Sequence, residues 1–228
     1  MRTYVDLHLT PKSHQEANKM ILLAGEMGYR CVATTNVEYN MQNSCDVKVA
    51  SRVDVGVRKS SQLFEVLKKI RRSNDLVAVM CQSKEAARQA AKDCRVDILL
   101  FPREPLHRRD VWLDSHEAEL AEGAGSAYEV NVSDLITGGA LRISKLLIIM
   151  RKEIENASKH DIPVILSSDA HSAFEMREPK ALTALASLLD IDEKYALEMI
   201  STIPIKVLDM NKSKNGKRRR AENAGQGN

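Results

Sequence analysis

The sequence predicts an α/β protein folded as a TIM-like barrel of about seven strands, followed by a disordered basic C-terminal tail. Short runs rich in Val, Ile and Leu alternate with longer segments of helical periodicity, which is the pattern of repeated βα units. The chain contains neither G-x-G-x-x-G nor the phosphate loop G-x-x-x-x-G-K-[ST], so the main evidence for an open nucleotide-binding sheet is lacking. Periodicity alone does not separate an open sheet from a barrel, and we favour the barrel.

The expected strands are the apolar runs, because parallel strands buried on both faces read as continuous apolar stretches. They cover residues 3–8, 30–35, 47–57, 75–81, 96–101, 127–132 and 163–168. The expected helices cover residues 13–27, 60–72, 83–94, 141–160, 180–189 and 193–201. Ser13, with Glu16 three residues later, predicts a capping box at the first helix, and Gly28 predicts its end.

Composition predicts one globular domain over residues 1–210 and a tail over residues 211–228. Of the 228 residues, 43% are hydrophobic and 29% are charged, which is enough apolar material for a sizeable core. The tail holds six basic residues and one acidic residue, while the whole chain carries only +3, so the domain itself is slightly acidic. Any basic surface on the domain must therefore be a local patch, and the tail is a candidate electrostatic tether for RNA.

Several features predict a cytoplasmic protein with no membrane contact. The longest apolar run, at residues 146–150, is far too short to cross a bilayer, and the first residues do not resemble a signal peptide. The four cysteines contain no C-x-x-C pair, which predicts reduced core thiols rather than a zinc site or disulfides. They are Cys31, Cys45, Cys81 and Cys94.

Two D-x-H pairs lie at the ends of the first and last predicted strands. Asp6 and His8 form one pair, and Asp169 and His171 form the other. Barrel closure would bring these strand ends together at the C-terminal mouth, where active sites of such folds are built. Two interpretations stay open: the four residues are metal ligands, or the carboxylates accept hydrogen bonds from local backbone amides and the histidines end exposed strands.

A basic loop follows the fifth predicted strand on the same side of the barrel. Arginine pairs bidentately with phosphate and histidine stacks on bases, so these residues are candidate RNA contacts, with an ordinary solvated loop as the alternative. Residues after the last strand are expected to join the same patch. The candidate RNA-binding residues are Arg103, His107, Arg108, Arg109, Arg177 and Lys180.

Several short motifs resemble the archaeal ribonuclease P protein component 3 family, whose eukaryotic counterpart is a thirty-kilodalton subunit. They are the SSDA sequence at residues 167–170, Arg177-x-Pro179, S-x-x-P at Ser201 and Pro204, and the opening YVDLHL. The resemblance spans residues 1 to about 210, and its specific part is the C-terminal third.

That family resembles PHP-type metal-dependent barrels, which carry H-x-H on the first strand and further His, Glu and Asp ligands on later strands. This chain departs from the pattern. Asp6 stands in place of the first histidine, the second strand is followed by TTNVE, and no convincing glutamate ligand ends the third strand. The resemblance therefore implies a PHP-like barrel without an intact metal site.

The resemblance implies a protein subunit of ribonuclease P, the ribonucleoprotein endoribonuclease that removes 5′ leaders from precursor tRNA. In that complex a Mg²⁺-dependent RNA is the catalyst, so this subunit would need no cofactor and no catalytic residue. Its implied partners are the ribonuclease P RNA and other protein subunits, especially a small ferredoxin-like one. The alternative is a self-sufficient metal-dependent phosphoesterase of the PHP type, with Asp6, His8, Asp169 and His171 as its site.

Overall fold

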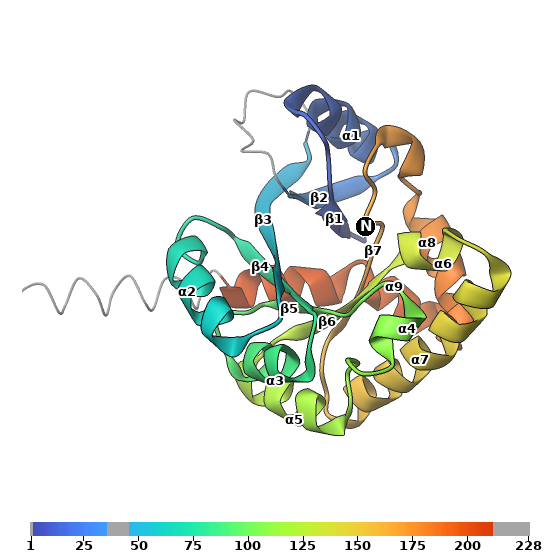
Figure 1. Cartoon of the computed structure of the whole chain (residues 1–228). Helices are drawn as coiled ribbons and strands as arrows, with labels where there is room; N and C mark the ends of the chain where they lie inside the picture. Colours follow the sequence, from blue (N-terminus) through green and yellow to red (C-terminus); the bar gives the residue numbers. More distant parts are fainter. Residues whose placement is uncertain (1, 36–45, 212–228) are drawn as a thin grey trace, which may run out of the picture.

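Seven parallel strands form one sheet that is nearly closed into a barrel, with helices around it (Figure 1). The computed structural model describes residues 2–35 and 46–211. The strands follow the chain order β1 to β7, and each pairs in parallel with the next. They are β1 (Tyr4–Leu9), β2 (Tyr29–Thr34), β3 (Lys48–Val57), β4 (Leu76–Cys81), β5 (Ile98–Leu100), β6 (Ala127–Asn131) and β7 (Val164–Ser167). All seven predicted strands are confirmed.

The six predicted helices are also present, and within the described residues the structure adds three helices between β5 and α7 and a fourth over residues 202–211. The predicted set corresponds to α1 (His14–Glu26), α2 (Ser60–Ile70), α3 (Lys84–Lys92), α7 (Ala140–Lys159), α8 (Pro179–Ala186) and α9 (Glu193–Met199). The first three additional helices are α4 (Pro105–Arg108), α5 (Ser115–Ala124) and α6 (Val132–Ile136), and single 3₁₀ turns form η1 (Ala173–Glu175) and η2 (Ser187–Leu189). Helix α4 lies within the segment predicted to be a loop, and it is too short to show an apolar periodicity.

The capping box predicted at α1 is only half formed. The Ser13 hydroxyl accepts a hydrogen bond from the Glu16 amide at 3.2 Å, as an N-cap should. The Glu16 carboxylate instead accepts the Ala173 amide at 2.9 Å, so it ties α1 to η1. Gly28 follows the helix with φ of +91°, a left-handed conformation that glycine adopts without strain.

At the C-terminal end of the barrel, β1 is joined to the residues that follow β7. At the opposite end, a helix packs against the strands. A parallel bridge joins Leu9 of β1 to Ala170 after β7, and the Thr10 amide donates to the Ala170 carbonyl at 2.8 Å. Residues 202–211 are helical, and their Val207 and Leu208 pack against the apolar residues at the beginnings of the strands. This helix was not predicted, and its packing seals the barrel opposite the mouth.

The helices α1 to α9 cover the outside of the sheet with a second apolar layer. Cys31 and Cys81 are buried, as predicted, whereas Cys94 is exposed, and Cys45 lies outside the described residues. Among the described residues, none of the helices has both the length and the apolar character that a membrane span needs. The tail predicted for residues 211–228 lies outside the described residues, apart from Asn211.

Candidate functional site at the barrel mouth

His8 lies at the centre of a polar cluster at the mouth of the barrel. Its Nε2 is 3.0 Å from a carboxylate oxygen of Asp54, and its Nδ1 is 3.0 Å from the side-chain oxygen of Asn131. Glu129 and Asp169 lie 3.3 and 3.4 Å from the same ring. Both ring nitrogens thus face acceptors, an arrangement that suits the doubly protonated imidazolium.

The charge of His8 follows from its neighbours. Burial and the nearby Arg52 guanidinium oppose protonation, but the negative charge of Glu129 and hydrogen bonds to Asp54 and Glu129 outweigh them. Together they raise the pKa of His8 to about 9. The imidazole is therefore a cation at neutral pH.

A buried arginine supplies the second cation of the cluster. Arg52 projects from β3 and donates to both carboxylate oxygens of Glu129 on β6, at 2.8 and 2.6 Å. Its Nε donates to Asp54 at 2.7 Å, and its Nη1 also donates to the Leu7 carbonyl at 2.6 Å. Although burial opposes ionisation, the Arg52 charge and then His8 lower the pKa of Glu129 to about 2.

Asp169 follows β7 and lies at the rim of the mouth. Its backbone has φ of +50°, a left-handed conformation that non-glycine residues rarely adopt. One carboxylate oxygen forms an ion pair with Arg103 and accepts the Ser133 hydroxyl at 2.9 Å. Arg103 also lies 3.3 Å from Asp134 on α6. Arg103 is thus a third cation, held at the lip of the barrel.

The structure brings together three of the four predicted metal-ligand candidates. His8 and Asp169 are neighbours, and His171 Nε2 lies 3.7 Å from Asp169 with about a third of its side chain exposed. Asp6 has a different environment, because one of its oxygens accepts the backbone amides of His8 and Ser168, each at 3.1 Å. Burial raises the pKa of Asp6. The amide-capping interpretation therefore describes Asp6.

Side-chain cations already engage the carboxylates at the mouth. Both ring nitrogens of His8 face oxygen atoms of Asp54 and Asn131, and the carboxylates around the ring already pair with Arg52 or Arg103. Within residues 2–35 and 46–211, no group of three or more His, Cys, Asp or Glu side chains has an arrangement suited to a metal. Side-chain cations balance the carboxylates here.

One predicted RNA-binding residue lies in the core instead. Arg108 is 1% exposed, and its guanidinium donates to both carboxylate oxygens of Glu153 on α7 at 3.0 and 2.8 Å and to the Tyr128 hydroxyl at 2.9 Å. The Arg108 side chain projects from α4 into the core, where its ion pair with Glu153 joins α4 to α7. Burial removes Arg108 from the candidate RNA contacts.

The other basic candidates lie in different places. His107 and Arg109 are exposed on and after α4, and Arg103 reaches the mouth. Arg177 is partly exposed, and its guanidinium donates to the Phe174 and Met176 carbonyls of its own loop. Lys180 is exposed and lines a hollow with Tyr4, at the beginning of β1, and with residues of α9.

The residues that hold the mouth together are not among the predicted site residues. These are Arg52 and Asp54 on β3, Glu129 and Asn131 on β6, and Ser133 and Asp134 on α6. One signal was available. Polar residues two apart inside an apolar strand lie on one face of it, so the pairs Arg52/Asp54 on β3 and Glu129/Asn131 on β6 indicate a polar site inside the sheet.

Comparisons with known proteins agree with this fold. A family model described as RNase P subunit p30 matches residues 3–216. Ribonuclease P protein component 3 of Methanosarcina acetivorans is 28% identical over 213 residues, covering 90% of this chain and 88% of that protein. A chain in the structure of archaeal ribonuclease P with mature tRNA superposes with a TM-score of 0.74 at 25% identity, over 90% of each chain.

Histidinol phosphate phosphatase from Lactococcus lactis, solved with zinc, L-histidinol and phosphate, superposes with a TM-score of 0.52. The identity is 12% over 82% of this chain and 93% of that one, so the likeness concerns the barrel fold alone. The family model, in contrast, spans nearly all the described residues. This chain belongs to the RNase P subunit p30 family, and it is a protein subunit of ribonuclease P.

Proposed function

We propose that this subunit carries out no chemistry itself and instead supports the catalytic RNA of ribonuclease P in removing 5′ leaders from precursor tRNA. The proposal rests on the mouth of the barrel, where side-chain cations already pair with the carboxylates. His8, Arg52 and Arg103 provide the positive charge there, and they engage the carboxylates that a metal ion would need. The Mg²⁺ of the reaction then belongs to the RNA.

The loop between β7 and α8 is the RNA-contact surface that we favour. Phe174 is 95% exposed, and Arg177 donates to the carbonyl of that same residue at 3.1 Å. An exposed aromatic ring and a guanidinium in the same loop suit unstacked bases and phosphates of RNA. Lys180 extends the positive charge into α8, and His107 and Arg103 are secondary candidates near the mouth.

The partners in this proposal are the ribonuclease P RNA, precursor tRNA as the substrate of the complex, and other protein subunits in the cytoplasm, including a small ferredoxin-like one. The similar solved chain comes from a structure of archaeal ribonuclease P with mature tRNA, and this likeness supports an RNA-bound role. The basic tail, at residues 212–228, would add a salt-sensitive tether to RNA.

Reconstitution tests the proposal. Ribonuclease P RNA and the remaining protein subunits from the same organism are assembled with and without this chain, and cleavage of precursor tRNA is measured in Mg²⁺. The chain should increase the rate, and the isolated protein should hydrolyse no phosphoester with Mg²⁺, Mn²⁺ or Zn²⁺. Turnover by the isolated protein that Asp169→Ala abolishes without unfolding would support the phosphoesterase alternative instead.

A further inference from the structure

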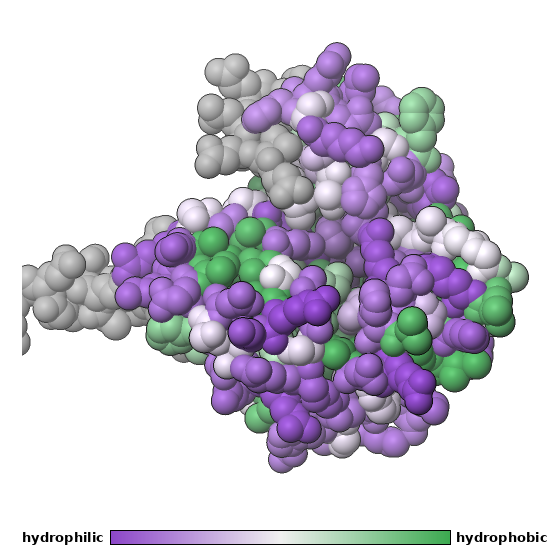
Figure 2. Space-filling view, viewed as in Figure 1, coloured by the Kyte–Doolittle hydropathy of each residue, from purple (hydrophilic) through white to green (hydrophobic). Residues whose placement is uncertain are grey.

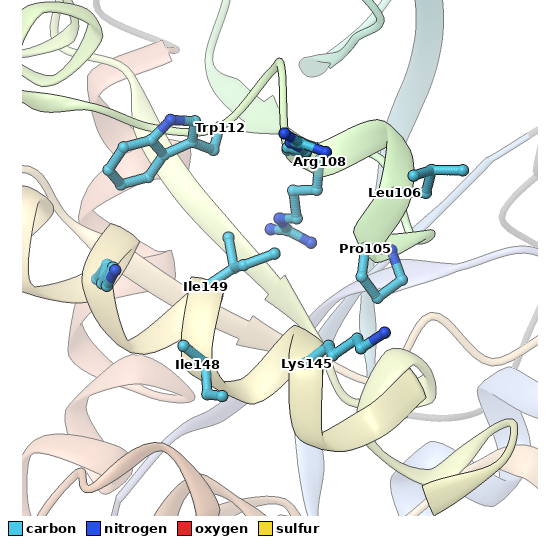
Figure 3. Close-up of a pocket in the computed structure, with 9 residues that line it drawn as sticks. Pro105, Leu106, Arg108, Trp112, Lys145, Ile148 and Ile149 are labelled. Atoms are coloured by element: carbon cyan, nitrogen blue, oxygen red, sulfur yellow. The ribbon is translucent and has the colours of Figure 1, made fainter. Parts of the chain in front are cut away.

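A groove between α4 and α7 exposes apolar side chains at the surface (Figure 3). It has a volume of about 580 Å³, and apolar residues of both helices together with Trp112 form its floor. Leu106 is 74% exposed and Ile148 is 56% exposed. Figure 2 shows apolar surface gathered over α4 and α7, with hydrophilic residues around it. The floor residues are Pro105, Leu106, Trp112, Ile148 and Ile149.

The charges that border the groove are all positive. Arg109, Lys145, Lys152 and the buried Arg108 line it, and none of the described acidic side chains does. Within the part of the chain that the structure describes, neither Arg109 nor Lys145 forms a salt bridge. The rim therefore offers positive charge to a ligand, and the apolar floor restricts that ligand to one with an apolar face.

The exposed face of α7 has the spacing of a helix-docking seam. Leu141, Lys145, Ile148 and Lys152 follow one another at intervals of four, three and four residues, which places them on one side of the helix. Leu141 is 69% exposed, so the apolar seam extends by two turns beyond Ile148. A second helix packed along this side would bury the apolar residues. Asp or Glu residues beside its own apolar stripe would then lie near Lys145 and Lys152.

The walls of the groove are held in place before anything binds. The buried ion pair of Arg108 with Glu153 joins α4 to α7, and Arg142 on α7 donates to Glu104 at 3.0 Å and to the Arg103 carbonyl at 3.0 Å. A preformed groove avoids part of the ordering cost of association. The buried Arg108 therefore serves the surface indirectly, by fixing the distance between its two helices.

We infer that this groove binds an amphipathic helix of another protein subunit, with an apolar stripe flanked by Asp or Glu. The inference rests on the proposed function, because it presumes that the chain works in a multi-protein assembly. RNA fits less well, because the floor is mainly aliphatic and bases stack on aromatic rings. Arg109 is thereby assigned to a protein contact.

Trp112 is the only tryptophan in the chain, so it reports directly on the groove. The protein is prepared with 5-fluorotryptophan and its single ¹⁹F resonance is followed while each of the other protein subunits, or the ribonuclease P RNA alone, is added. One protein subunit should shift the resonance, and RNA alone should not. Leu106→Asp should weaken binding of that subunit at least tenfold, and Lys145→Glu should weaken it most at low salt.

Leu22→Asp on α1 is the matched control, because Leu22 is 48% exposed and lies outside the groove. Leu106 is so exposed that its replacement should leave the melting temperature unchanged, and Ile148→Asp provides a second variant. The groove inference fails if no subunit shifts the resonance, if RNA alone shifts it, or if Leu106→Asp binds like the wild type. Failure of the wild-type chain to stimulate precursor-tRNA cleavage would instead reject the proposed function.

Discussion

Arg52 on β3 reaches across the barrel to Glu129 on β6 and holds both of its carboxylate oxygens, at 2.8 and 2.6 Å, with neither side chain exposed to solvent. The two residues are 77 positions apart in the chain. Their ion pair occupies the centre of the mouth, where other barrels of this shape place chemistry. In this protein the ion pair ties β3 to β6.

Arg52→Met should lower the free energy of unfolding by about 3–5 kcal/mol, because it leaves the buried Glu129 carboxylate without its cation. The double variant Arg52→Met/Glu129→Leu should recover much of that loss, since both charges are then gone. Urea denaturation measures both values, with the exposed Arg58→Met as control. A double variant as unstable as the single one would contradict the ion-pair explanation.

The stability of the protein should decrease as pH rises from about 6.5 to about 9. The folded state raises the pKa of His8 from 6.5 to about 9, so it binds a proton that the unfolded chain releases in this range. The contribution of His8 to the free energy of unfolding is complete below pH 6.5 and amounts to about 3 kcal/mol. Chemical denaturation at several pH values should give a slope that His8→Gln removes and that exposed His14→Gln keeps.

Arg108 and Arg109 are adjacent in sequence and should respond oppositely to substitution. Arg108→Met leaves Glu153 buried without a cation and should cost about 3–5 kcal/mol of folding stability. Arg109 is exposed, so Arg109→Met should change the folding stability by no more than about 0.5 kcal/mol. Thermal and urea unfolding of the two variants check this. Equal effects would mean that α4 does not bury its arginine in solution.

The loop after β7 should contribute to RNA affinity through charge. Arg177→Ala and Lys180→Ala should each flatten the slope of log affinity against log salt by about 0.7 to 0.9. Each variant should keep the wild-type melting temperature, and exposed Lys68→Ala on α2 should change neither quantity. Filter binding or anisotropy with ribonuclease P RNA over a range of salt concentrations gives the slopes. If Arg177→Ala lowers the melting temperature and leaves the slope unchanged, Arg177 is a structural clamp.

Deletion of residues 212–228 should leave the melting temperature of the domain unchanged, because this segment is poor in apolar residues. RNA affinity should fall at low salt and much less at high salt, since the lost term is electrostatic. Calorimetry and RNA binding of the truncated and full chains provide the comparison. A clear drop in melting temperature would show that the tail packs on the barrel.

The sequence by itself determined the strands, six of the helices and the family. Apolar runs and N-cap residues such as Ser13 act over a few positions, so they can be read in order along the chain. The motifs SSDA and S-x-x-P likewise identify the family from neighbouring residues. Periodicity could not reveal α4, because four residues are too few for a pattern.

Only the tertiary structure decided which charged side chains contact one another. Arg108 was one of the RNA-binding residues predicted in a basic loop, yet it pairs with Glu153, 45 residues away, and is buried. The same holds for His8 and Glu129, whose contact exists because barrel closure brings β1 and β6 within reach of one another. The energy of a charge depends on its burial and its partner, and both are set by residues distant in sequence. The sequence therefore indicated His8 and Asp169 at the mouth, and only the fold showed that Arg52 and Glu129 lie beside them and that these charges neutralise one another.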